Sequence, residues 1–183
     1  MDERAWAQLE ALVAQPAARA VGEIGLDYFR NLSPPEVQRD AFERQLGIAA
    51  AHRLPVLVHD RDAHADVTAT LLAWAGSGVL HAFSGDAEMA RSLTEAGFVV
   101  SFALPVAFGS AIGPRAAAQA LPAGAFVVET DAPYLGPDAK GRNEPTTVLR
   151  VVAELARLRG VEPATLMAPI RGAYEGVIGL SSG

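Results

Sequence analysis

Acidic and imidazole side chains stand close to the ends of several short apolar segments of this chain. In FVVETDAPYLG, three residues suited to a buried strand run directly into Glu129 and Asp131. Side chains alternate along a strand, so these two carboxylates are expected to share one face. Acids at the end of a buried strand are costly unless something cationic receives them. The stretch therefore indicates a cationic partner.

Further side chains of this kind occupy comparable places. Glu23 shares a face of its segment with Asp27, while His59 and His81 each follow an apolar run. Neutral imidazole and carboxylate together suit zinc, manganese or another divalent ion. Each residue alone has a structural alternative: a turn cap, a partner for a core arginine, or a hydrogen-bonded histidine. Their joint occurrence with Asp131 favours a metal site.

The elements that must position these residues alternate regularly along the chain. The segments that we expect to form strands are 21–26, 54–59, 78–83, 98–102 and 126–130. The segments that we expect to form helices are 2–15, 33–53, 64–75, 86–97, 114–121, 145–159 and 163–178. This alternation predicts one α/β domain over 1–183, with a parallel sheet and outer helices. Ligands bind beyond the carboxyl ends of such strands, where these polar residues fall.

The composition restricts the class of protein. Half of the 183 residues are apolar and 20% are charged, which favours a packed core over disorder. Cysteine is absent, which excludes disulfide and thiolate chemistry and predicts a cytoplasmic location. The first residues do not resemble a signal peptide, and no apolar run has the length of a membrane span. A net charge of −6 has the wrong sign for broad capture of nucleic acid, so an anionic substrate needs bound cations or local arginines.

The motifs around these residues resemble the TatD family of metal-dependent hydrolases. GEIGLDYFRN, LPVLVHDRDAHADV, GVLHAFSG, GFVVSFALPVAF, VVETDAPYLGP and GRNEP occur in the family's order. The resemblance implies a (β/α)8 TIM-type barrel with a two-metal site (Zn, Mn or Mg) that hydrolyses phosphodiesters, typically as a deoxyribonuclease. It implies that Glu23 bridges the metals and that His59 and His81 hold one of them. It also implies that Asp131 holds the other and orients or deprotonates the attacking water.

Three further side chains are candidates for contact with the substrate. Arg61 could pair bidentately with a phosphate, and Arg142 lies in the GRNEP loop. Ser84 is expected to open a helix whose first N–H groups could meet an anion. Surface salt bridges account equally well for the two arginines, and helix capping for Ser84. His52 and His64 lie near helix ends, where solvated or capping roles are expected.

One part of the family pattern is absent from this chain. The family carries a His-x-His pair on its first strand, and none of the four histidines here is two residues from another. A complete barrel has about 250 residues. We therefore expect an incomplete (β/α)8 barrel that lacks one or two N-terminal βα units. We expect it to bind one ion through Glu23, His59 and His81, and to self-associate through open sheet edges.

Three hypotheses about function follow from this departure. The chain is part of a longer phosphodiester hydrolase that acts by metal-activated water attack, on nucleic acid or a small phosphoester. Alternatively, it is a non-catalytic metal-binding remnant or scaffold of the same fold. In the third hypothesis it hydrolyses another class of ester, with a partner supplying the missing strands. Near the C-terminus, Ala173 and Ile178 replace the family's usual Asn and Phe, which predicts weaker docking of the last helix.

Overall fold

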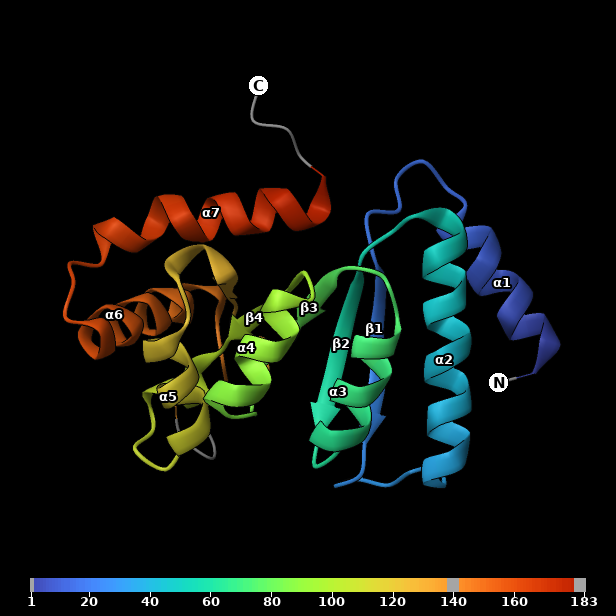
Figure 1. Cartoon of the computed structure of the whole chain (residues 1–183), viewed down its shortest axis with the longest axis horizontal. Helices are drawn as coiled ribbons and strands as arrows, with labels where there is room; N and C mark the ends of the chain where they lie inside the picture. The colour runs from blue at the N-terminus through green and yellow to red at the C-terminus, as the bar shows by residue number, and fades with distance from the viewer. Residues whose placement is uncertain (1, 138–141, 180–183) are drawn as a thin grey trace.

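The computed structural model describes residues 2–137 and 142–179, which contain one sheet of five parallel strands with helices packed against it (Figure 1). The strands are β1 (Val21–Asp27), β2 (Val56–Arg61), β3 (Gly78–Leu80), β4 (Phe98–Phe102) and β5 (Phe126–Val128). Each strand pairs in parallel with the next one along the chain. The predicted α/β fold with a parallel sheet is therefore confirmed. Within the described residues β1 and β5 are the two edges of this sheet.

The helices follow the strands in regular alternation. Those of the described chain are α1 (Glu3–Val13), α2 (Pro35–His52), α3 (His64–Ala73), α4 (Ala87–Glu95), α5 (Ile112–Ala120), α6 (Val148–Arg159) and α7 (Ala164–Ile178). Short 3-10 turns lie at Leu104–Ala107 (η1), Ala123–Ala125 (η2) and Pro145–Thr147 (η3). No helix in the described part of the chain is both long and apolar enough to span a membrane.

Local chemistry explains where several helices begin and end. The Asp2 carboxylate accepts the N–H of Ala5 at the start of α1. Asp86 accepts two N–H groups at the start of α4 in the same way. A left-handed Gly160 ends α6. The prediction that Ser84 opens a helix is therefore wrong, because α4 begins three residues later behind its own aspartate cap.

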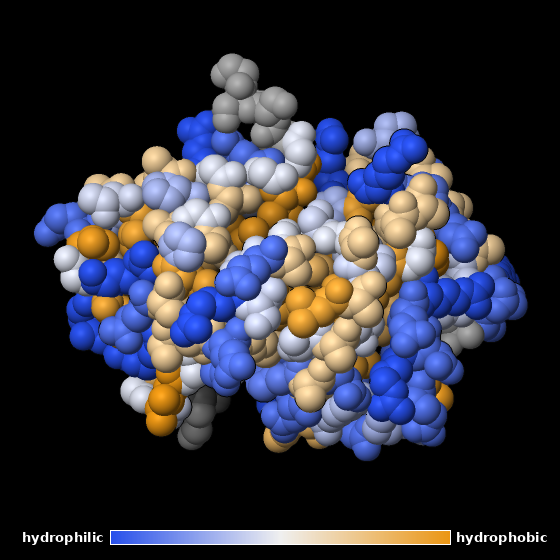
Figure 2. All heavy atoms as spheres, viewed as in Figure 1, coloured by the Kyte–Doolittle hydropathy of each residue, from blue (hydrophilic) through white to orange (hydrophobic). Residues whose placement is uncertain are grey.

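The core lies between the sheet and the helices. Figure 2 shows mainly polar side chains over α2, with small hydrophobic patches between neighbouring helices. The largest fully buried side chains include Phe42, Phe98, Phe102, Phe126, Leu71, Leu93 and Leu155. Each such burial contributes roughly 1.5–3 kcal/mol. Helix α7 buries Leu166 and Ile170 and contacts β5 and η2, so the last helix docks on the sheet despite its unusual residues.

A close approach between β1 and β2 depends on one glycine. Gly25 pairs with His59 and has a φ of 131°. A Cβ atom built on Gly25 would lie 2.1 Å from the carbonyl oxygen of His59. Only glycine combines this backbone conformation with such contact. The pairing fixes β1 beside the histidine-bearing end of β2.

Candidate metal centre

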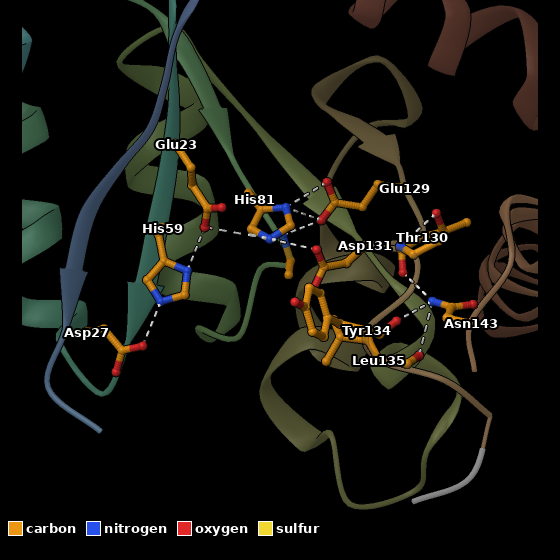
Figure 3. Close-up of polar contacts among 12 residues, drawn as sticks. Glu23, Asp27, His59, His81, Glu129, Thr130, Asp131, Tyr134, Leu135 and Asn143 are labelled. Atoms are coloured by element: carbon orange, nitrogen blue, oxygen red, sulfur yellow. Dashed lines mark hydrogen bonds and ion pairs between the residues drawn. The ribbon is translucent and has the colours of Figure 1, made fainter. Parts of the chain in front are cut away.

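The structure brings Glu23, His59, His81 and Asp131 together on one side of the sheet (Figure 3). The Oε1 atom of Glu23 lies 2.8 Å from Nδ1 of His59 and 3.9 Å from Nε2 of His81. The same Nε2 atom lies 3.8 Å from Oδ1 of Asp131. Glu23, His59 and His81 each offer a ligand atom within 4.8 Å of the others. The donor set of imidazole nitrogens and carboxylate oxygens fits a divalent cation.

Glu23 reaches this cluster from inside β1 rather than from the end of the strand. The register of β1 against β2 shifts between Val21 and Ile24, so the strand is irregular where Glu23 lies. Its side chain is 49% exposed. The expectation that every member of the cluster stands at a strand end is therefore wrong for this residue. The irregularity turns the carboxylate toward His59, which lies farther along its own strand.

Two further carboxylates lie behind the histidines. Asp27 Oδ2 is 3.2 Å from Nε2 of His59. Glu129 lies 2.9 and 3.0 Å from Nδ1 of His81 through its two oxygens, and it also accepts the N–H of Ala82. Each histidine thus directs its remaining nitrogen at the shared space: His59 its Nδ1 and His81 its Nε2. Carboxylates in this position fix the tautomer and orientation of a ligating histidine.

The Asp27 carboxylate is itself held in place. Its backbone exchanges two hydrogen bonds with the Gln38 amide, at 2.9 and 3.2 Å. The Arg30 N–H donates to Asp27 Oδ1 at 2.7 Å. Although burial acts in the opposite direction, this N–H and the His59 ring lower the pKa of Asp27 below its ordinary value. Asp27 is therefore an ionised acceptor for His59. The sequence predicted that Asp27 shares a face with Glu23, but it did not predict the contact of Asp27 with His59.

Negative charge is concentrated on the other side of the cluster. The hydrogen bond to Glu129 raises the pKa of His81 above its ordinary value. Burial raises the pKa of Asp131, and the carboxylates of Glu129 and Glu23 act in the same direction. The like charges around Asp131 are stabilised when a cation lies between them. The electrostatics of the cluster thus agree with its donor set.

The loop that carries Asp131 is not a continuation of the sheet. Strand β5 ends at Val128, and Asp131 has a φ of 56°, in the left-handed region. The simple alternation that predicted a common face for Glu129 and Asp131 therefore does not apply. Both carboxylates nevertheless face His81, because the backbone turns after the strand. Asn143, which the sequence did not single out, contacts this loop through its side chain (Figure 3).

The three candidates for substrate contact lie in different surroundings. The Arg61 guanidinium stacks on the Phe29 ring, 4.0 Å from its centroid, and lines the cleft in front of the cluster. Ser84 also lines this cleft, and its hydroxyl donates to the carbonyl oxygen of Asp60 at 3.4 Å. Arg142 is exposed and is not one of the described residues that line the cleft.

The two remaining histidines lie outside the cluster. His64 is the first residue of α3, and its Nδ1 lies 2.7 Å from the carboxylate of Asp60. This hydrogen bond raises the pKa of His64. His52 is the exposed last residue of α2. His64 thus ties the start of its helix to the end of β2.

The cluster opens into a cleft of about 1230 Å³. Two arginines, Arg30 and Arg61, contribute positive charge to its lining. Its mouth carries large exposed side chains: Leu32 (86% exposed), Ile112 (77%) and Tyr134 (68%). The cleft therefore offers apolar and aromatic surface beside the charged cluster, and has room for more than a single small ester.

The amino-acid sequence of this chain is similar to those of several known proteins. A family model described as "TatD related DNase" matches residues 1–178. The "Uncharacterized metal-dependent hydrolase YabD" of Bacillus subtilis is 37% identical over 164 residues, which cover 87% of this chain and 64% of YabD. The "3'-5' ssDNA/RNA exonuclease TatD" of Citrobacter koseri is 36% identical over 181 residues, covering 93% of this chain and 70% of that protein.

A similar arrangement is found among solved structures. The crystal structure of YJJV, a TatD homolog from Escherichia coli K12, superposes with a TM-score of 0.90 at 28% identity. The match covers 99% of this chain and 72% of that one. The chain described here thus corresponds to somewhat less than two thirds of YabD and to almost three quarters of YJJV.

Proposed function

Because this chain belongs to the TatD-related DNase family, we propose that it acts as a metal-dependent hydrolase of phosphodiester bonds in nucleic acid. The observation that carries the proposal is the convergence of Glu23, His59, His81 and Asp131 on one space, in the lining of a large cleft. Imidazole and carboxylate ligands beside an open cleft are typical of catalytic rather than purely structural metal sites.

Each residue has a distinct part in the proposed site. Glu23, His59 through Nδ1 and His81 through Nε2 would hold one divalent ion, and Asp131 faces the same space. When bound, such an ion lowers the pKa of water and neutralises charge on a phosphate. Asp131 would orient the attacking water and accept its proton.

The cleft supports a single-stranded substrate. Arg30 and Arg61 can contact phosphates, and Tyr134 offers an exposed ring beside Asp131 (Figure 3). Unpaired bases can stack on such a ring, whereas bases within a duplex already stack on each other. The Citrobacter relative is named an ssDNA/RNA exonuclease, which agrees with this substrate class.

A cleavage assay with matched variants tests the proposal. An end-labelled single-stranded oligonucleotide is incubated with Mg²⁺, Mn²⁺ or Zn²⁺, or with chelator. We expect cleavage that chelator abolishes and that Asp131→Asn lowers by at least 100-fold. Glu162→Gln removes one charge at an exposed site far along the chain and should leave cleavage unchanged. Undiminished cleavage in chelator would contradict the metal requirement.

A second candidate function is metal binding without hydrolysis. It is favoured by the single three-ligand group, Glu23, His59 and His81, found among the described residues, because hydrolysis in two-metal sites needs a second ion. Calorimetry that finds one tightly bound ion per chain, together with no cleavage of any nucleic acid or model ester, would support this alternative.

A further inference from the structure

Asn143 is a buried polar side chain that contacts the Asp131 loop from behind (Figure 3). Only 2% of it is exposed. Its Nδ2 atom donates to the carbonyl oxygens of Thr130 at 2.5 Å, Tyr134 at 2.6 Å and Leu135 at 3.3 Å. One amide group thus contacts the backbone on both sides of Asp131.

The other polar atoms of Asn143 are also used. Its Oδ1 accepts the N–H of Glu144 at 2.9 Å, and its own N–H donates to the carbonyl oxygen of Pro133 at 3.2 Å. Both ends of the amide therefore have partners, which fixes the orientation of the side chain. Asn143 is followed by η3 and α6, and α6 packs into the core through Val151 and Leu155. Asn143 therefore directly precedes a segment that packs into the core.

The loop requires such support. Asp131 and Leu135 both have left-handed backbone conformations, with φ values of 56° and 53°. These conformations are unfavourable for residues other than glycine and persist only where the surroundings hold them. The chain leaves the sheet after Val128, so the ladder of strand hydrogen bonds does not extend to Asp131.

We propose that Asn143 is a positioning residue, which holds the Asp131 carboxylate against His81 by fixing the backbone on both sides of it. This inference rests on the proposed role of Asp131 in hydrolysis. Every hydrogen bond of the Asn143 side chain to a described residue is to a backbone group, so it acts through the loop. Within the GRNEP motif, the residue with this positioning role is therefore Asn143 rather than Arg142.

The variant Asn143→Asp tests this role because it keeps the size of the side chain and removes its N–H donors. We expect kcat to fall 10- to 100-fold with less than a threefold change in KM, since a displacement of about 1 Å can cost 100-fold. Hydrogen–deuterium exchange should become faster in 130–136 and stay unchanged in β1 to β4. The affinity for Mn²⁺ should remain within threefold, because Glu23, His59 and His81 lie outside the loop.

Two controls separate positioning from general instability. Thr146→Asp adds the same charge at an exposed position three residues away and should leave all three measurements unchanged. Asn143→Ala removes the donors without adding charge and should reproduce the fall in kcat. Wild-type kcat in both Asn143 variants would overturn the proposal, as would faster exchange throughout the core. If the wild-type chain hydrolyses nothing, the proposed function fails, and unchanged exchange in 130–136 would still overturn the role of Asn143.

Discussion

The Nε2 atom of His81 lies 3.8 Å from the Oδ1 atom of Asp131. This separation is too long for a hydrogen bond, and it leaves room for a water on a cation held by His81 to lie beside the Asp131 carboxylate. The opposite nitrogen of the ring is held by Glu129. His81 is therefore oriented from behind and presents its free nitrogen to the space that it shares with Asp131.

Glu129→Gln should weaken metal binding although Glu129 is not one of the proposed ligands. The change removes the charge that holds the Nδ1–H tautomer of His81, and loss of such a partner typically costs 10- to 100-fold in affinity. Titration calorimetry with Mn²⁺ measures the effect. Glu162→Gln serves as the control for charge. Equal affinity in Glu129→Gln and wild type would show that Glu129 does not orient His81.

The binding of single-stranded DNA should depend only weakly on salt. Two arginines line the cleft, and each phosphate contact contributes a slope of about −0.7 on a logarithmic plot of affinity against salt for a single strand. We expect a slope of about −1.4, reduced by about half in Arg61→Ala. Fluorescence anisotropy measures this slope with Asp131→Asn, which is expected to cleave at least 100-fold more slowly than wild type. Arg142→Ala should change little, and a loss equal to that of Arg61→Ala would place the substrate beyond the cleft.

Acid should remove the contribution of Glu154 to stability. Its hydrogen bond to Arg157 lowers its pKa to about 2, and Arg115 on α5 acts in the same direction. A lowered folded-state pKa means that the stabilisation is complete above about pH 4.5 and is lost as the pH falls toward 2. Glu154→Gln should therefore lower the free energy of unfolding at pH 7 by on the order of 1–3 kcal/mol. In urea unfolding, the difference in the free energy of unfolding between wild type and Glu154→Gln should shrink as the pH falls through this range. A difference that stays constant would contradict the assigned contribution of Glu154.

Gly25→Ala should destabilise the fold and displace the cluster. The added methyl group would lie 2.1 Å from the His59 carbonyl oxygen, at a backbone conformation that alanine rarely adopts. We expect a loss of roughly 2–4 kcal/mol in the free energy of unfolding. Gly47→Ala is the matched control, because nothing lies within 4 Å of its added Cβ inside α2. It should stabilise by about 0.5–1 kcal/mol. Equal stabilities of the two variants in urea would contradict the close approach.

The sequence was sufficient to predict the parallel sheet, because short apolar runs and amphipathic runs alternate without interruption. It also singled out Glu23, His59, His81 and Asp131, each a ligand type placed beside a predicted strand, and the structure brings these four side chains together. The end of β3 was not predictable, however. The chain turns at Ala82, which has a φ of 43°, and the apolar residue that follows gives no sign of this turn.

The partners behind the cluster were harder to predict for a different reason. Asp27 and Glu129 are visible as acids, but their contacts join residues that lie far apart in the chain. Asn143 gave even less signal, because its partners are backbone carbonyl groups that every residue possesses. Patterns of periodicity and residue type describe elements and their ends. They do not describe which loop a single amide will hold.

The proposed ligands Glu23, His59 and His81 come from β1, β2 and the segment after β3, so they are brought together only when these strands have paired. An unfolded chain lacks the complete set, and a cation would bind the folded state almost exclusively. Metal at 100 times its dissociation constant would then raise the free energy of unfolding by about 2.7 kcal/mol. Binding of the cation thereby reports on cooperative folding. The shift that it causes in the midpoint of thermal unfolding measures the affinity of the site without any turnover of substrate.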